Sequence, residues 1–375
     1  MNPGSQCHAP RECQVGMKKR TICLTLLLAA GIFIYPLNTA HSQAPLKVQQ
    51  PGSQIKTHEV QSLHSPDVPV EGLEKEIISL NQEIQQNPKD GKLFLNRGLA
   101  YARFGQMKQA VWDFSRAIEL NPQDKEAYHH RGLSFMRFGE YPQAIWDLGR
   151  FIEADPRNAQ AYRDRAFAYL GLGDYSQAIR DLDRSAELSP KDAETYNNRG
   201  LAWAHLGRLN QAIADFEKTI ECDPHFAHAY FNRGLAYAKK GNFQQAILDF
   251  SRAIELNSQH EQAYHQRGLA LIEMNNDSDG MKDLDKAVAL NPDNPLVHID
   301  RGLALGRKGA FELAVKACDR ALALNPRDPK AYLIRAAAYE RLDKEDKAIE
   351  AYVMAAKLGD KTAQEYLTNK DIEWQ

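Results

Sequence analysis

Hydrophobic and small side chains recur along this chain with a period of 34 residues. From Gly91 to Thr362 the pattern fills eight repeats, which begin at residues 91, 125, 159, 193, 227, 261, 295 and 329. Within each repeat, positions 4, 8 and 11 carry apolar or small residues and share one helical face. A second apolar face follows at positions 20, 24 and 27. A supersecondary unit that recurs at a fixed period is typical of a stacked solenoid.

Position 15 is predicted to end the first helix of each repeat. It is glycine in six repeats, and Asn275 or Asp343 in the other two. All three residue types tolerate the left-handed backbone that commonly ends a helix. In the sixth repeat Gly280 replaces the alanine of position 20, and glycine inside a helix costs about 1 kcal/mol. We therefore expect residues 270–285 to open locally before the other repeats.

A set of residues at fixed positions resembles the tetratricopeptide repeat over residues 91–362. It consists of glycine at position 8, an aromatic at 11, alanine at 20, an aromatic at 24, alanine at 27 and proline at 32. The resemblance implies an all-α fold, a right-handed superhelical solenoid of antiparallel helix pairs whose first helices line a concave groove. It also implies a scaffold that binds a protein or peptide in that groove.

The sequence contains no motif that points to catalysis. A nucleophile elbow, a phosphate-binding loop and paired catalytic carboxylates all have recognisable spacings, and none of these spacings stands out. We therefore expect neither catalytic residues nor a cofactor, and we do not expect an enzyme.

Shorter segments flank the repeats. Residues 45–70 contain four prolines, few apolar residues and no period, which predicts a disordered linker. Residues 71–90 are predicted to hold an N-terminal capping helix, and residues 363–375 a C-terminal cap and tail. The apolar residues of the N-terminal cap, spaced by 4, 3 and 4, are Leu73, Ile77, Leu80 and Ile84.

Residues 1–44 carry the pattern of an export signal. The basic run Met17-Lys18-Lys19-Arg20 precedes an uncharged segment, residues 21–35. Ala40 and Ser42 then suit the positions before a cleavage site. We expect cleavage after Ser42 and export to the periplasm or cell envelope.

An uncleaved N-terminal segment is the alternative. Residues 21–37 would then tether the repeats to a membrane as an assembly or chaperone-like factor, with the repeats outside the cytoplasm. Met17 is an alternative start to Met1, because a signal that begins there is closer to the usual pattern.

Charge and cysteine content change this picture little. The chain has 47 basic and 49 acidic residues, a formal net charge of -2, which gives no reason to expect nucleic acid as a partner. Cys222 and Cys318 lie almost three periods apart, and stacked repeats contact mainly their neighbours. We therefore expect no disulfide between them.

Position 7 is arginine in all eight repeats, although an apolar residue is common there in the family. Position 23 is aspartate in the first six repeats and then Ala317 and Ala351. This pattern predicts an ion pair between the two helices of a repeat. The alternative is a row of arginines that binds an acidic or phosphorylated partner. Arg301 and Arg335, whose repeats lack the aspartate, are predicted to be free and to face a ligand.

Positions 2, 5, 6, 9, 12 and 13 are predicted to line the groove, because they point away from the face that packs on the second helix. Of these, positions 5 and 6 vary in size and charge from repeat to repeat. Asparagine there can bond the backbone amides of an extended peptide. Adjacent His129 and His130 diverge by 100° around a helix, so we predict no metal site from them. The predicted partner-binding residues are Asn96, His129, His130, Arg163, Asp164, Asn197, Asn198, Phe231, Asn232, His265, Gln266 and Asp300, together with Arg301 and Arg335.

Overall fold

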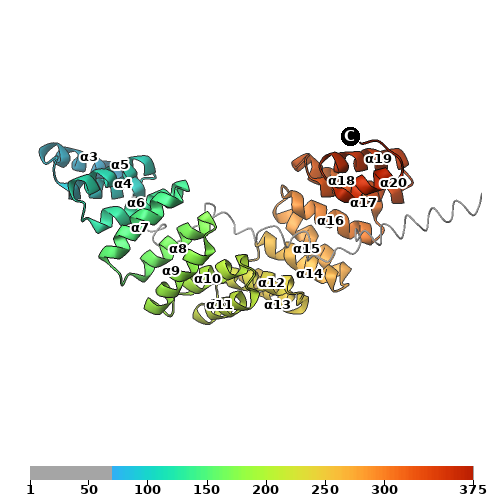
Figure 1. The fold of residues 1–375 in the computed structure, drawn as a ribbon, viewed down its shortest axis with the longest axis horizontal. Coiled ribbons are helices and arrows are strands. Elements are labelled where there is room, and N and C mark those ends of the chain that lie inside the picture. Colours follow the sequence, from blue (N-terminus) through green and yellow to red (C-terminus); the bar gives the residue numbers. More distant parts are fainter. Residues whose placement is uncertain (1–69, 375) are drawn as a thin grey trace, which may run out of the picture. The chain divides into compact units, whose positions relative to one another are not determined.

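The computed structural model describes residues 70–374, and within that range the secondary structure consists of eighteen α-helices without a strand (Figure 1). The described residues form two compact bodies. We call residues 70–240 the N-terminal body and residues 241–374 the C-terminal body. The predicted export signal and linker lie outside the described residues.

The N-terminal body begins with one helix before the first repeat and continues as helix pairs. Its helices are α3 (Val70–Gln86), α4 (Gly91–Arg103), α5 (Met107–Leu120), α6 (Lys125–Phe138), α7 (Tyr141–Ala154), α8 (Ala159–Leu172), α9 (Tyr175–Leu188), α10 (Ala193–His205), α11 (Leu209–Cys222) and α12 (Ala227–Lys239).

The C-terminal body starts at the second helix of the fifth repeat, so the two helices of that repeat belong to different bodies. Its helices are α13 (Phe243–Leu256), α14 (Glu261–Glu273), α15 (Asp277–Leu290), α16 (Pro295–Arg307), α17 (Phe311–Leu324), α18 (Pro329–Arg341), α19 (Glu345–Lys357) and α20 (Lys361–Asn369).

Local sequence sets the helix ends. Asp124 begins α6 by accepting a hydrogen bond from the amide of Ala127 at 3.2 Å, which satisfies a donor that the helix leaves unpaired. At position 15, Gly139 has φ of 74°, and Asn275 and Asp343 adopt φ of 61° and 55°. The predicted left-handed helix ends are therefore confirmed, including the two without glycine.

The two helices of a repeat approach closely at position 8. A Cβ atom added to Gly200 would lie 2.7 Å from the ring of Phe216, at position 24 of the same repeat. Phe114 and Phe216 are each at most 1% exposed, and burying such a side chain stabilises the fold by about 1.5–3 kcal/mol. The small residue of the first helix thus makes room for the aromatic of the second.

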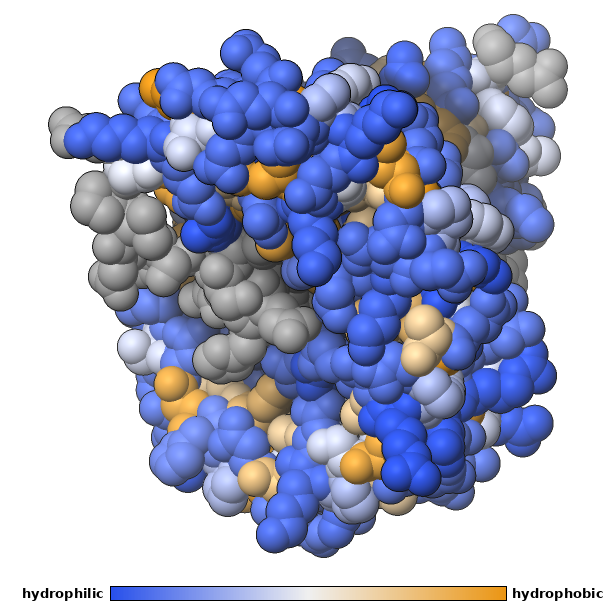
Figure 2. Space-filling view, turned by 90° about the vertical axis from the view of Figure 1, so that its left-hand side faces the viewer, coloured by the Kyte–Doolittle hydropathy of each residue, from blue (hydrophilic) through white to orange (hydrophobic). Residues whose placement is uncertain are grey.

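First helices lie on the inner side of each body. In the N-terminal body α4, α6, α8, α10 and α12 contact one another in succession, whereas successive second helices are joined chiefly through the first helices between them (Figure 1). The same holds for α14, α16 and α18 in the C-terminal body. The face shown in Figure 2 is mostly hydrophilic, with hydrophobic residues singly or in small groups.

Two further properties follow from the described residues. None of their helices combines the length and the apolar character that crossing a bilayer requires. Cys222 and Cys318 are free cysteines. Burial raises the pKa of the Cys318 thiol to about 12, so this thiol stays protonated at neutral pH.

Candidate partner-binding face

A bidentate ion pair joins the two helices of a repeat through positions 7 and 23. Arg131 donates to both carboxylate oxygens of Asp147 at 2.8 and 2.7 Å, and the Asp147 side chain is only 1% exposed. The other pairs of this kind are Arg97–Asp113, Arg165–Asp181, Arg199–Asp215 and Arg267–Asp283. The predicted ion pair is confirmed in these five repeats.

An aromatic ring at position 4 packs against each of these guanidinium groups. The Arg131 guanidinium lies 5.7 Å from the ring centroid of Tyr128, and that of Arg199 lies 5.4 Å from Tyr196. Burial raises the pKa of the Asp147 carboxyl group, while the hydrogen bonds and charge of Arg131 act to lower it. The arginines of these repeats are therefore held by packing as well as by charge.

The prediction that Arg301 and Arg335 are free is wrong. Arg301 donates from Nε to Asp285 at 2.7 Å, and Arg335 donates from Nη1 to Asp319 at 2.9 Å. Both aspartates stand at position 25 of the preceding repeat. The acid missing from position 23 is thus replaced by one on the preceding repeat, which lies 16 residues before the arginine instead of 16 residues after it.

In earlier repeats, too, the residue at position 25 accepts a hydrogen bond from the position 7 arginine of the next repeat. Arg199 donates to Asp183 at 2.7 Å in addition to its pair with Asp215. In other repeats the acceptor at position 25 is neutral, as in the bonds from Arg131 to Ser115 at 3.1 Å and from Arg267 to Ser251 at 3.0 Å. The position 7 arginine therefore links consecutive repeats as well as the two helices of one repeat.

Positions 5 and 6 contact each other between neighbouring repeats. His265 Nε2 and Asp300 Oδ2 are hydrogen-bonded at 2.8 Å, and Asn232 donates to Asn197 at 3.1 Å. Each pair joins position 5 of one repeat to position 6 of the next. The last such pair is apolar, because Ile299 and Ile334 belong to one hydrophobic cluster. In these three pairs, the residue types at positions 5 and 6 therefore match each other across the boundary between repeats.

These contacts decide where the predicted partner-binding residues lie. Asn96 is exposed on α4. Arg163 is half-buried and pairs with Asp192 and, at 3.3 Å, with Glu194 of the next repeat. The buried residues of the set are His129, Asp164, Asn197, Phe231, His265 and Asp300. The half-buried ones are His130, Arg163, Asn198, Asn232, Gln266, Arg301 and Arg335.

The open part of the inner surface lies along positions 6, 9 and 13 of the first helices, although Asp164 and Asp300 at position 6 and Leu133 and Leu269 at position 9 are buried. In the first repeat these positions are Asn96, Leu99 and Arg103, which line a shallow pocket of about 320 Å³ between α3 and α4. From α3 the pocket is lined by Glu76, Ser79, Leu80 and Glu83. Arg103 donates to Glu76 at 2.6 Å across this boundary.

Position 13, which is predicted to face the groove, forms a row of basic residues in the N-terminal body. It consists of Arg103, Arg137, His205 and Lys239, interrupted by Gly171. A Cβ atom at Gly171 would lie 2.5 Å from the ring of Tyr141, so the tyrosine fills that place. Spacing alone would have revealed the row, since positions 6, 9 and 13 share a helical face.

Burial acts on the ionisable side chains of this row. It lowers the pKa of Arg137, and it lowers the pKa of His205, on which the charge of Lys239 acts in the same direction. His205 is therefore neutral at pH 7, and the cations of the row are Arg103, Arg137 and Lys239. His205 stacks on Tyr175 with ring centroids 4.5 Å apart. A partly desolvated cation interacts more strongly with an incoming negative charge than one in bulk water does.

Comparison with known families agrees with this architecture. Models of the tetratricopeptide repeat match residues 91–124, 132–194, 164–225, 227–260, 265–329 and 299–361. The chain belongs to the tetratricopeptide repeat family. Members of this family are protein-interaction scaffolds, and the TPR solenoid of helix pairs accounts for the period and for the turn at position 15.

Solved TPR structures share this fold. The APC/C hetero-tetramer Cut9-Hcn1 matches with a TM-score of 0.53 at 16% identity, over 75% of this chain and 56% of that chain. The protein of a Pseudomonas aeruginosa pilF study matches with 0.51 at 18% identity, over 56% and 97%. A TPR protein from Parabacteroides merdae ATCC 43184 matches with 0.50 at 19% identity, over 66% and 98%. No curated protein matches the chain.

One group of possible metal ligands lies on this TPR face within the described residues. It consists of Glu126, His129 and His130 on α6, with ligand atoms within 4.8 Å of one another. Burial lowers the pKa of His130 to about 4, and the neighbouring His129 acts in the same direction, so this imidazole is neutral at pH 7.

Proposed function

We propose that the inner face of the N-terminal body binds an extended segment of a partner protein that carries acidic side chains. The observation that carries this proposal is the basic row at position 13 beside the open positions 6 and 9. Leucines at position 9, such as Leu99, Leu201 and Leu235, offer half-buried apolar contacts to the partner. Asn96, Asn198 and Asn232 at position 6 supply amides that can bond a peptide backbone.

This role is binding without catalysis. A helical scaffold that holds an extended peptide gains affinity from backbone hydrogen bonds and specificity from the side chains between them. Positively charged side chains along such a surface also favour acidic partners over basic ones and speed their association.

Neutralising the basic row is expected to weaken peptide binding. A random-peptide display library selected on the full chain should yield acidic peptides. The double variant Arg137→Gln/Lys239→Gln should bind the selected peptides at least about tenfold more weakly, or about 1.4 kcal/mol, by fluorescence anisotropy. Both residues lie on the proposed surface, and Arg137 is already desolvated.

The matched control removes the same charge from the second helices. Arg116→Gln/Arg180→Gln changes two cations on α5 and α9, where Arg116 pairs with Glu119 and Arg180 donates to Gln177. This variant should bind the peptides as the unaltered chain does. Equal affinity of the unaltered chain and Arg137→Gln/Lys239→Gln would refute the proposal.

We also propose that the repeats act outside the cytoplasm, on the strength of the basic, uncharged and small-residue pattern of residues 17–42. Mass spectrometry and N-terminal sequencing of the protein from a host with an export pathway should give a chain that begins at Gln43. A chain that keeps residues 21–37 and sediments with membranes would instead support the tethered form.

A further inference from the structure

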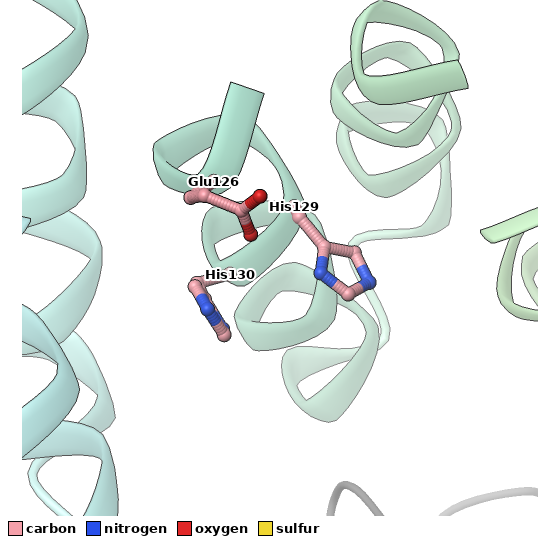
Figure 3. A group of neighbouring side chains, drawn as sticks. All are labelled: Glu126, His129 and His130. Carbon is pink, nitrogen blue, oxygen red and sulfur yellow. The ribbon is translucent and has the colours of Figure 1, made fainter. Parts of the chain in front are cut away.

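Three side chains of α6 meet although two of them are adjacent in sequence. Glu126 precedes His129 by three residues and His130 by four, so it lies one helical turn before both. One ligand atom from each of the three lies within 4.8 Å of the others. Figure 3 shows the carboxylate of Glu126 directed toward the space between the two imidazole rings.

The two imidazoles are held by packing and keep buried nitrogens without partners. His129 is 7% exposed and stacks on Phe151, and His130 stacks on Phe114. Neither His129 Nε2 nor His130 Nδ1 has a hydrogen-bond partner among residues 70–374. A buried polar atom without a partner costs about 1–3 kcal/mol, so such atoms call for an explanation.

An aspartate of the next repeat faces the far side of His129. Asp164 Oδ2 lies 3.5 Å from His129 Nε2, and this oxygen is also buried without a hydrogen bond. His129 Nδ1 is therefore the nitrogen left for Glu126 and His130. An imidazole that binds a metal through one nitrogen usually donates the other N–H to a carboxylate, which orients the ring.

Comparison with the sixth repeat shows which possible metal ligands occur in the second repeat but not in the sixth. His265 and Asp300 form the same contact between repeats, at 2.8 Å. In that repeat, however, the residues equivalent to Glu126 and His130 are Gln262 and Gln266. The histidine–aspartate contact thus belongs to the stacking of repeats, and the metal-ligating groups are added to it in the second repeat.

We propose that Glu126, His129 and His130 bind a divalent transition-metal ion, with Asp164 as the residue that orients His129. Two imidazoles and a carboxylate suit Zn²⁺, Ni²⁺ or Cu²⁺, whereas Mg²⁺ and Ca²⁺ prefer oxygen ligands. At a Zn–N distance of 2.0–2.1 Å, tetrahedral ligands are about 3.3 Å apart, so small rotations of these side chains close the site.

The ion would have room for a further ligand. Three protein ligands leave at least one coordination position for water or for a side chain of a bound molecule. Glu126 is exposed, so one of the three ligands lies at the protein surface. The site is independent of the basic row, which is contributed by position 13.

Zinc titration of the full chain tests the proposal. The protein is purified without a histidine tag, stripped with EDTA and titrated with zinc chloride against a chromophoric chelator. Glu126→Gln should remove one ion from the stoichiometry or weaken that site at least about tenfold, and His130→Gln should do the same. Because Glu126 is exposed, its substitution leaves the fold intact and keeps the test valid if His130→Gln unfolds.

Two further variants separate the site from its surroundings. Asp164→Asn should weaken the same site about 10–100-fold and change the visible spectrum of bound Co²⁺. His265→Gln, which removes the equivalent imidazole of the sixth repeat, should leave zinc stoichiometry and affinity unchanged. Unaltered zinc binding in Glu126→Gln, or a chain that binds no zinc ion tighter than millimolar, would overturn the proposal.

Discussion

Replacing Asp147 by alanine is expected to lower the free energy of unfolding of the N-terminal body by about 3–5 kcal/mol. The Asp147 side chain is 1% exposed and that of Arg131 is 16% exposed, so the substitution leaves a guanidinium largely removed from water without its counter-charge. Ser115, at 3.1 Å, is its other acceptor and is neutral. Urea unfolding followed by tryptophan fluorescence measures this, because Trp112, Trp146 and Trp203 all lie in this body.

An exposed aspartate of the same network provides the control. Asp183 pairs with Arg199 at 2.7 Å, but its side chain is 52% exposed and Arg199 keeps its pair with Asp215. Asp183→Ala should therefore cost less than about 1 kcal/mol. If Asp147→Ala lowered the free energy of unfolding no more than Asp183→Ala does, the buried Arg131–Asp147 pair would not stabilise the packing of α6 against α7.

Replacing Gly280 by alanine is expected to destabilise the sixth repeat by about 1–3 kcal/mol. Alanine in a helix is usually about 1 kcal/mol better than glycine. Here, however, the added Cβ would lie 2.7 Å from the backbone oxygen of Gly268 and 2.6 Å from Ile272. Hydrogen exchange of peptides from α14 and α15 should become faster.

Gly149 is the matched control for Gly280. It also lies inside a helix, α7, but a Cβ atom there would meet only Arg165, at 3.6 Å. Gly149→Ala should therefore slow exchange in α7 and raise its stability by about 1 kcal/mol. Two glycines with the same local propensity would then respond in opposite directions. Slower hydrogen exchange in Gly280→Ala would show that the short distance between an added Cβ atom and the Gly268 backbone oxygen does not destabilise the repeat.

Gly280 also shows that helix propensity alone does not explain why a glycine lies inside a helix. From the sequence, glycine at position 20 indicates only a weak helix and local opening. In the structure it stands at the closest approach of α14 and α15, facing Gly268. The expected opening of residues 270–285 remains a prediction. The close packing of Gly280 against Gly268 explains why glycine stands there, and helix propensity does not describe that packing.

The candidate surface was predicted in part. Asn96 was expected to face a partner, and it is exposed beside a pocket. His265 and Asp300 were expected there too, but they are buried against each other. Each residue varies from repeat to repeat as a recognition surface would, but it varies together with its contact partner 35 residues away.

Features that depend on spacing within one repeat can be predicted from the order of residues alone. Positions 4, 8, 11, 20, 24 and 27, the turn at position 15 and the pairing of Arg131 with Asp147 all follow from helical periodicity and from residues that vary together. These relations are local, so the order of residues is enough to reveal them.

Features that depend on how repeats stack emerge from the three-dimensional arrangement of the helices. This arrangement pairs Arg301 with Asp285 of the preceding repeat, buries His129 against Asp164, and leaves Asn96, Leu99 and Arg103 beside an open pocket. Side chains on neighbouring repeats contact each other or not according to the rotation and separation of successive helix pairs. That geometry is set by packing across the whole interface, which no single spacing in the sequence records.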